Sequence, residues 1–209
     1  MTLHNVQYTM SRAALHLSLF VFLLTVFLLN PSSTQAIGNV EGNLPNFADF
    51  RQSVQNGETK VLRGVYVTDV LALSVVQQPA GFPFYVSNQE GETTQFGMAS
   101  QYGNIGLLAH NTLSGRSFAH LSIGQLVRLV YGDGRVENFV VTEIMRFRAS
   151  NPESVSSSFR NLDRNETLSA SEMFNRAYAG ERHLVFQTCI EAGGDPSWGL
   201  LFIVALPKH

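Results

Sequence analysis

Hydrophobic residues in most of this chain form short runs that alternate with polar residues and end at turn-forming residues. The clearest example is Gln125 to Tyr131 followed by Arg135 to Arg146, with Gly132-Asp133-Gly134 between them. An Asp-Gly pair between two alternating apolar runs is a strong local signal for a β-hairpin. The pattern therefore predicts an antiparallel hairpin over residues 125 to 146.

Other runs in the chain have the same character, and the last two are separated by a segment, Ile190 to Trp198, that reads as a loop. Many short strands with turn residues between them are typical of a small closed barrel or a sandwich. The sequence thus predicts an all-β fold. The further predicted strands are Lys60 to Ala72, Pro83 to Ser87, Thr93 to Ala99, Ile105 to His110, His183 to Cys189 and Gly199 to Leu206.

Two short helices interrupt the β pattern. Asn46 can cap a helix over Phe47 to Gln55, which Asn56-Gly57 would end. A second amphipathic segment runs from Ser169 to Tyr178, with Gly180 behind it. The polar, serine-rich stretch Asn151 to Glu166 before it reads as a long surface loop.

The N-terminal segment differs from the rest of the chain because it is almost continuously apolar from Ala13 to Leu29, with Arg12 in front. The polar stretch behind it ends in Thr34-Gln-Ala36, an acceptable cleavage site. Residues 1–36 therefore fit either a cleaved signal peptide or an uncleaved membrane anchor helix. Both predict an extracytoplasmic protein, secreted or membrane-anchored, with a linker and short helix over 37–56 and a barrel domain over 57–209.

Charge excludes some classes of function. The formal net charge is −2, and charged residues make up 14% of the chain. No basic stripe suggests a nucleic-acid partner, and the acidic residues and histidines form no cluster that suggests a metal site. The sequence predicts neither a metal nor an organic cofactor.

Cys189 is the only cysteine in the chain. In an oxidising compartment cysteines normally pair, so a single thiol is either buried and inert or retained for its reactivity. A reactive thiol needs a base or a positive field nearby. His183 shares the strand but lies roughly 20 Å away along it. His110 is the better candidate, because it ends an apolar strand beside the polar loop Asn111 to Gly115.

Several short motifs together resemble the sortase family. Leu184-Val-Phe-Gln-Thr-Cys189 is similar to the family's cysteine signature, and Ala109-His110 followed by Phe118-Ala-His-Leu121 is similar to its histidine signature. Gly124-Gln125 stands where the family usually has Gly-Asp. The resemblance covers most of residues 57 to 207. It implies a closed β-barrel of about eight strands and an extracytoplasmic cysteine transpeptidase of bacterial cell surfaces.

The resemblance also implies roles for particular residues. Cys189 would attack a peptide carbonyl within a sorting motif and form a thioacyl intermediate, with His110 as general acid and base. Thr188 would shape the substrate pocket and oxyanion site, and Asn111 and Trp198 are candidate substrate-binding residues. The partners implied are a peptide or protein with a sorting motif and an amine acceptor, either a cell-wall peptide or a pilin-type lysine, or water.

One position departs from the family pattern. Sortases carry an arginine on the last strand across from the cysteine, and this position corresponds to Leu200 here. No Arg or Lys occurs between Cys189 and Lys208, and Arg116 in the loop after His110 is a weak substitute. Three alternatives stay open: a transpeptidase, possibly impaired; an inactive sortase-fold protein that binds a peptide or the cell wall; and a secreted thiol hydrolase.

Overall fold

The computed structural model describes residues 44–152, 154 and 157–208, so the predicted signal or anchor over 1–36 lies outside the described residues. Within them, the elements follow one another as α2 Phe47–Val54, β1 Leu62–Val67, β2 Leu71–Gln77, β3 Glu92–Gln95, α3 Gly97–Gln101, β4 Ile105–Leu108, η1 Ser114–His120, β5 Leu126–Tyr131, β6 Val136–Ala149, β7 Phe159–Asn161, β8 Thr167–Leu168, α4 Ala170–Tyr178, β9 Leu184–Ala192 and β10 Asp195–Pro207. None of the helices in this described part is long and apolar enough to cross a membrane.

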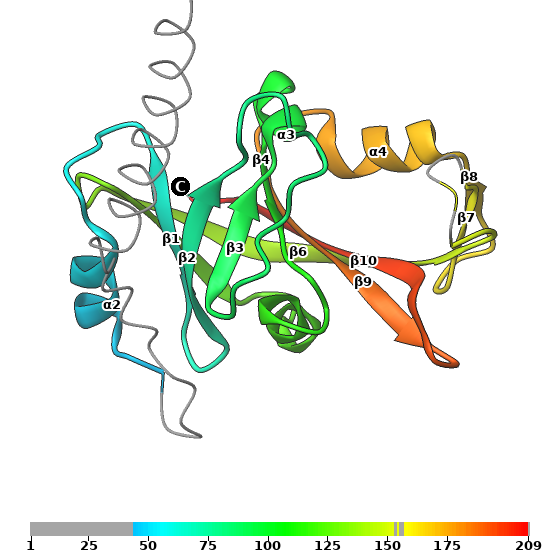
Figure 1. Ribbon diagram of the computed structural model, residues 1–209, viewed down its shortest axis with the longest axis horizontal. Helices are drawn as coiled ribbons and strands as arrows, with labels where there is room; N and C mark the ends of the chain where they lie inside the picture. Colours follow the sequence, from blue (N-terminus) through cyan, green and yellow to red (C-terminus); the bar gives the residue numbers. More distant parts are fainter. Residues whose placement is uncertain (1–43, 153, 155–156, 209) are drawn as a thin grey trace, which may run out of the picture. The chain divides into compact units, whose positions relative to one another are not determined.

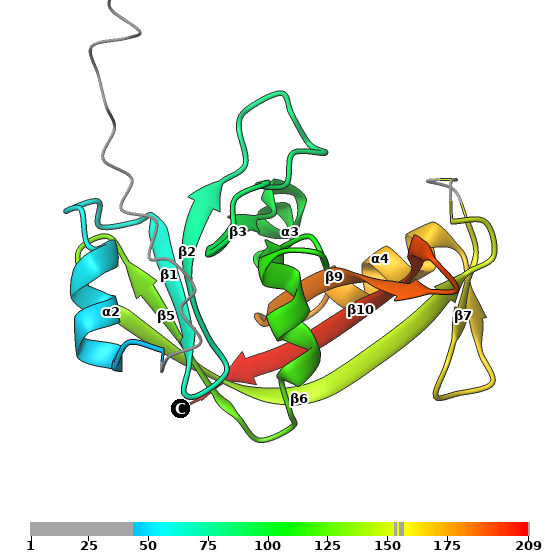
Figure 2. The same ribbon diagram turned by 60° about the horizontal axis from the view of Figure 1, so that its bottom comes forward.

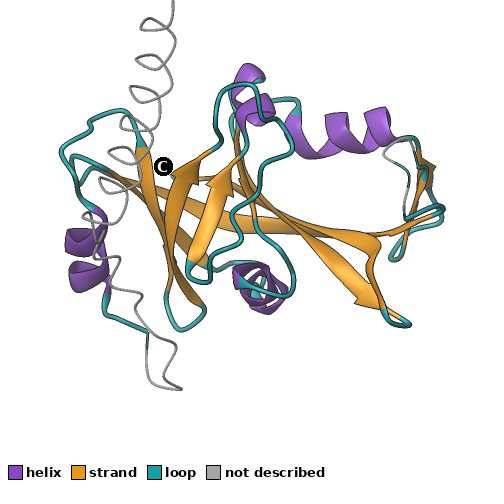
Figure 3. Cartoon of the chain, in the orientation of Figure 1, coloured by secondary structure: helices purple, strands orange, loops and turns teal. Residues whose placement is uncertain are grey.

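The strands form a closed barrel. Their order is β10-β9-β4-β3-β2-β1-β5-β6, and β6 pairs again with β10, so eight strands close the ring (Figure 1; Figure 3). Neighbours pair antiparallel except β2 with β3 and β4 with β9, which are parallel. The predicted closed barrel of about eight strands with short helices is confirmed.

One apolar core fills the barrel. It collects inward-facing residues from the ring strands, such as Val65, Leu107 and Phe186, all fully buried. Phe118 from η1 joins it, and its ring meets that of Phe186 edge-on, with the centroids 5.0 Å apart. The short η1 helix therefore fixes the chain that follows β4 against the barrel.

Three strands, β6, β9 and β10, run on beyond the ring and form an extended sheet that also carries β7 (Figure 2). The helix α4 packs on one face of this sheet through a second apolar cluster that includes Phe147, Tyr178 and Phe202. Ser169 is the N-cap of α4 and forms a capping box with Glu172. Within the part of the chain that the structure describes, no helix lies on the opposite face of the extended sheet (Figure 2).

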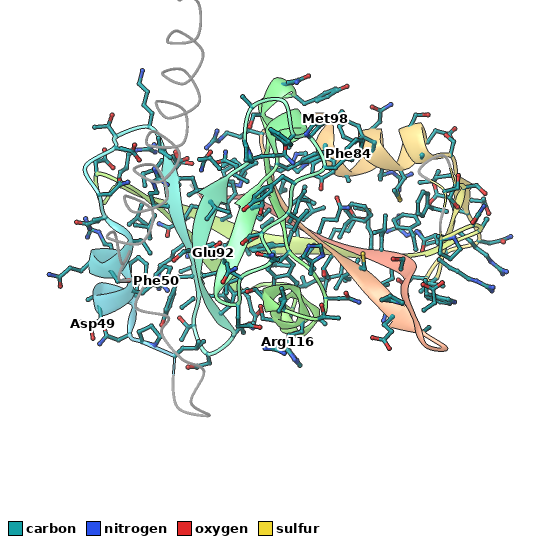
Figure 4. The ribbon with its side chains drawn as sticks, viewed as in Figure 1. Asp49, Phe50, Phe84, Glu92, Met98 and Arg116 are labelled. Atoms are coloured by element: carbon teal, nitrogen blue, oxygen red, sulfur yellow. The ribbon has the colours of Figure 1, made fainter. Side chains whose placement is uncertain are left out.

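The helix α2 closes another part of the barrel surface. The side chain of Asn46 accepts a hydrogen bond from the Asp49 backbone, as expected of a helix cap. Phe50, labelled in Figure 4, is buried against β1, where a side chain at Gly64 would collide with its ring. The predicted helix over Phe47 to Gln55 is thus present, with Gln55 as its C-terminal cap.

The predicted strand Lys60 to Ala72 is wrong as a single element. It is two antiparallel strands, β1 and β2, that meet at a turn around Asp69. Asp69 has a φ of 59°, the left-handed conformation that reverses the chain there. Asp tolerates this conformation better than most residues, but without a glycine the turn leaves a weak signal in the sequence.

Two further predicted strands need correction. Residues 83 to 87 form an irregular loop, because Pro83 removes a donor and the Gln78 side chain binds the carbonyls of Pro83 and Tyr85 instead. Phe84 in this loop is 89% exposed. The run Thr93 to Ala99 divides into β3 and the start of α3.

The two predicted loops are partly strand. Most of Ile190 to Trp198 belongs to the β9–β10 hairpin, which turns at Gly193 and Gly194, both with positive φ. The predicted loop Asn151 to Glu166 contains β7, which pairs with β6. Both differences extend the sheet beyond the barrel, and neither is visible in local hydrophobic alternation.

Candidate active site

Cys189 lies in β9, on the face that turns away from the barrel interior. Leu184, Phe186 and Ile190 of the same strand pack on the barrel core, whereas Val185 packs in the cluster under α4. Alternation along a strand places Cys189 with Val185. Its side chain is half-buried, and burial is the sole cause that raises the pKa of its thiol.

His110 follows β4, the neighbour of β9 in the ring. The two strands are parallel, and Leu108 is the register partner of Gln187. The backbone of Ala109 continues this ladder with a hydrogen bond of 3.3 Å to the Gln187 carbonyl. His110 lies two residues after Leu108, and Cys189 lies two residues after Gln187, so the same register pairs His110 with Cys189. Neighbouring strands lie about 4.8 Å apart.

Both side chains belong to the same face of the sheet. Ile105, Leu107 and Ala109 pack on the barrel core, so alternation directs His110 to the other side, as for Cys189. His110 is exposed, and no hydrogen bond joins its ring to Cys189 or to any other described residue. The histidine is near the thiol but not engaged with it.

Leu200 is the register partner of Cys189 on the other side, in β10. It packs against the apolar cluster under α4, and its own partner on the next strand is Phe147 of β6. One row across four strands thus reads His110, Cys189, Leu200, Phe147. The pairing predicted from the sequence for β9 and β10 is present, and an uncharged leucine is beside the thiol.

Arg116 does not complete this row. Its guanidinium pairs with Glu90 at 2.8 Å, on the outside of η1 (Figure 4). It makes no hydrogen bond or ion pair with His110, Cys189 or Leu200. To interact with Cys189, the Arg116 side chain would first have to break its ion pair with Glu90.

The other predicted site residues, Thr188, Asn111 and Trp198, lie outside this row. Thr188 is 4% exposed and lies on the barrel side of β9, where its hydroxyl has no hydrogen-bond partner among the described residues. Asn111 donates a hydrogen bond of 3.2 Å to the carbonyl of Pro196, which ties the His110 loop to the hairpin. The guanidinium carbon of Arg148 lies 5.6 Å from the centre of the Trp198 ring. Of these three side chains, that of Thr188 is the most buried, and its role in shaping the substrate pocket stays a prediction.

Gly115 explains how the loop after His110 can lie so close to β9. A side chain at this position would overlap the Thr188 hydroxyl and lie 2.6 Å from the carbonyl oxygens of Ala109 and His110. The backbone amide of Gly115 instead donates to the His110 carbonyl at 3.0 Å. A glycine is therefore required here to hold His110 beside Cys189.

Gln187 is a polar group of this site that motif matching alone does not single out. It lies two positions before Cys189 on the same face of β9, and its amide oxygen accepts a hydrogen bond from the Tyr178 hydroxyl of α4. That bond leaves the amide nitrogen without a partner among the described residues. Spacing was the available signal, since residues two apart in a strand share a face.

The site has no evident metal-binding character. In the part of the chain that the structure describes, no group of three or more His, Cys, Asp or Glu side chains could hold a metal ion. The row offers a thiol, an imidazole and two apolar side chains, and Gln187 adds an amide donor on the same face of β9.

Comparison with known proteins yields matches of structure alone. No family model and no curated protein match the chain. The matching solved structures include sortase A of Listeria monocytogenes, 13% identical over 71% of this chain and 88% of that one, with a TM-score of 0.45. A sortase from Actinomyces oris is 12% identical over 74% and 83%, with a TM-score of 0.46. The barrel resembles the sortase fold.

A third match is sortase C of Clostridium perfringens solved with its C-terminal cell wall sorting motif, 12% identical over 78% of this chain and 83% of that one, with a TM-score of 0.44. Identities and TM-scores of this size support no statement about the reaction, so the sortase-like row must be judged on its own geometry.

Proposed function

We propose that this protein is an extracytoplasmic, sortase-like cysteine transpeptidase that cleaves a peptide through a thioacyl intermediate. The observation that supports this most is the pairing of Cys189 with His110. They occupy matching register positions on neighbouring parallel strands and share one face of the sheet. A nucleophile needs a base within reach, and this arrangement brings one alongside the only thiol of the chain.

The proposed reaction has two acyl-transfer steps. In the first, the sulfur of Cys189 bonds to a peptide carbonyl carbon, the C–N bond breaks, and the thiol proton passes through His110 to the departing amine. In the second, an incoming amine loses its proton to His110 and attacks the thioester, which releases the thiol and forms a new amide. Water in place of the amine gives hydrolysis. No electrons are transferred, so no redox cofactor is needed.

Gln187 is the proposed donor for the oxyanion in place of the arginine. Its amide nitrogen is available on the Cys189 face because Tyr178 holds the amide oxygen. A neutral donor stabilises a developing negative charge less than a cation does. We therefore expect a slow enzyme, in which Gln187→Leu lowers kcat about 10²-fold. Tyr178→Phe, which removes the group that orients the amide, should have a smaller effect.

The rest of the row suits an apolar substrate side chain. Leu200 and Phe147 follow Cys189 on the next two strands, and both belong to the cluster under α4. Leu200 is only half-buried, so a peptide bound beside the thiol would meet its apolar side chain, whereas Phe147 is fully buried and supports Leu200 from the next strand. The substrate class we propose is a sorting-motif peptide with an apolar residue near the scissile bond.

A panel of quenched fluorescent peptides with and without an amine acceptor tests the proposal. We expect the protein to cleave the peptide, and the cleavage rate to be higher when the amine acceptor is present. Mass spectrometry should also detect a thioacyl adduct on Cys189. Cys189→Ala and His110→Ala should each abolish turnover, while His120→Ala, which changes an exposed histidine on η1, should not. Cleavage that survives Cys189→Ala would refute the mechanism.

A second candidate function is peptide binding without catalysis. The raised pKa of the Cys189 thiol and the leucine beside it favour this alternative. It predicts equal peptide affinity for the native protein and for Cys189→Ala, with no turnover and no adduct in either.

A further inference from the structure

A group of basic side chains lies on the opposite face of the extended sheet from Cys189. On β6, Phe147 packs under α4, so its neighbour Arg148 points to the uncovered side. Here an open pocket of about 380 Å³ is lined by Arg148, Arg160, Arg164, Asn161, Asn165 and Trp198, among others. We call Arg148, Arg160 and Trp198 the arginine shelf.

Two arginines of the shelf stand directly opposite each other. Arg148 of β6 and Arg160 of β7 are antiparallel register partners, both exposed. Side chains at such positions have Cβ atoms about 4.5–5.5 Å apart, and like charges there repel. Backbone pairing of β6 with β7 does not require arginine at both positions, since a carboxylate at either one would be compatible with the same pairing.

Neither of these arginines has an acidic partner among the described residues. Most other arginines do: Arg146 holds Asp163 through two hydrogen bonds, and Arg164 pairs with Glu143. Asp163 is the one acidic residue that lines the pocket, and Arg146 neutralises it. The shelf therefore keeps two uncompensated positive charges in a chain whose net charge is −2.

The chemistry of the shelf fits an anion with several oxygens. Two guanidinium forks that face each other can each donate two hydrogen bonds to one phosphate group, whereas a carboxylate offers two oxygens in all. Asn161 and Asn165 line the same pocket, although the Asn161 side-chain oxygen is already bound by the backbone of Asp163 and Arg164. Trp198 stacks on Arg148 and leaves an aromatic surface beside it.

We propose that the arginine shelf is a phosphate-binding site that takes either free phosphate or a phosphate ester. Binding would remove the repulsion between Arg148 and Arg160. The site is separate from the row of Cys189, because it lies on the other face of the sheet and shares no residue with it. It does not depend on the proposed transpeptidase activity.

Trp198 provides the measurement, because it is the only tryptophan in the chain. Its emission should change in a saturable manner when inorganic phosphate is added to the native protein at constant ionic strength. Arg160→Gln leaves the contact between Arg148 and Trp198 in place but removes half of the site. We expect it to weaken the apparent affinity about tenfold or more.

Matched variants and ligands define the outcome. Arg128→Gln, which changes a half-buried arginine on β5, and Cys189→Ala should both bind phosphate as the native protein does. Glycerol 3-phosphate that binds more tightly than inorganic phosphate would assign the site to an ester, and equal affinities would assign it to the free ion. The proposal is overturned if chloride or acetate gives the same change, if the change never saturates, or if Arg160→Gln has no effect.

Discussion

The two faces of the extended sheet differ in their charge: one lacks a positive charge where a thiol lies, and the other has two positive charges without acidic partners. On the α4 side, Cys189 lies next to Leu200, so a thiol that would benefit from positive charge has an apolar neighbour. On the other side, Arg148 and Arg160 face each other with no acid to pair with them. Phe147 and Arg148 are adjacent on β6, so the alternation of one strand separates the two environments.

The comparison shows that charge in this protein is placed by strand register and not by composition. The extended sheet is rich in arginine, yet none of these side chains reaches the row of Cys189 because each one points to the other face or lies too far along its strand. One positive charge introduced on the face that carries Cys189 should therefore affect peptide cleavage more than several on the opposite face.

Gly199 lies in β10 between β6 and β9, the strands that carry Arg148 and Cys189. Its substitution should lower the stability of the protein more than any other change considered. Gly199 is the register partner of Arg148, and a side chain here would overlap the carbonyl oxygen of Phe147. Gly199→Val should separate β10 from β6 and lower the free energy of unfolding by about 2–3 kcal/mol. Urea denaturation measures this, and both the Cys189 row and the arginine shelf should be disturbed together.

Gly97→Ala is the matched control for this experiment. A side chain at Gly97 would meet only the flexible end of Gln78, at 3.3 Å. Its effect should stay below about 1 kcal/mol. If Gly199→Val is equally mild, the close contact between β10 and β6 is not what couples the two faces.

Leu200→Arg places a positive charge on the face that lacks one. Its guanidinium would be beside Cys189, so we expect the peptide cleavage rate to rise at least about tenfold, part of the 10²–10³-fold that a single oxyanion donor can contribute. Leu206→Arg, on the same strand but exposed and distant, should not raise it. A rate unchanged by Leu200→Arg would mean that the oxyanion does not form on this side of the thiol.

The sequence predicted much of this site, because its main partners lie on regular strands. The Asp133-Gly134 turn correctly indicated the β5–β6 hairpin, and the positions of Cys189, His110 and Leu200 follow from simple strand registers. Strand alternation is a local property, so it can be read from local sequence.

The parts that were missed depend on contacts between distant segments. The role of Gln187 requires Tyr178, which comes from a helix and not from a neighbouring strand. The arginine shelf requires β7, a short strand inside a polar, serine-rich stretch that reads as a loop. Because β7 is stabilised by pairing with β6 and not by its own hydrophobic pattern, no local signal could place Arg160 opposite Arg148.

The two faces should also differ in how they respond to pH. Burial raises the pKa of the Cys189 thiol, so its thiolate is scarcer at neutral pH than that of an exposed cysteine. Alkylation by iodoacetamide should therefore still accelerate above the ordinary thiol pKa of about 8.5. Phosphate binding at the shelf should change little over the same range, because arginine does not titrate there.

The same shift has a consequence for stability. The folded-state pKa of Cys189 is raised above its unfolded value, so the stabilising contribution of the neutral buried thiol is complete below the unfolded pKa and is lost as the pH rises through the folded one. The free energy of unfolding of the native protein should fall more steeply above about pH 8.5 than that of Cys189→Ala. If the free energy of unfolding depends on pH in the same way in the native protein and in Cys189→Ala, the thiol is solvated in the folded protein as it is in the unfolded chain.

The smallest effect is expected from reversing one charge on the shelf. Arg160→Glu would place a carboxylate opposite Arg148 and replace a repulsive cross-strand pair with an attractive one. The free energy of unfolding should rise by about 0.2–1 kcal/mol, and the gain should shrink at high salt, where exposed charges are screened. Urea denaturation at low and high salt measures both effects. Arg128→Glu controls for net charge, because it changes the net charge equally and the register partners of Arg128 are the uncharged residues Tyr66 and Asn138. If both variants are stabilised alike, the gain comes from the overall charge of the protein, and the two shelf arginines do not oppose each other as their register implies.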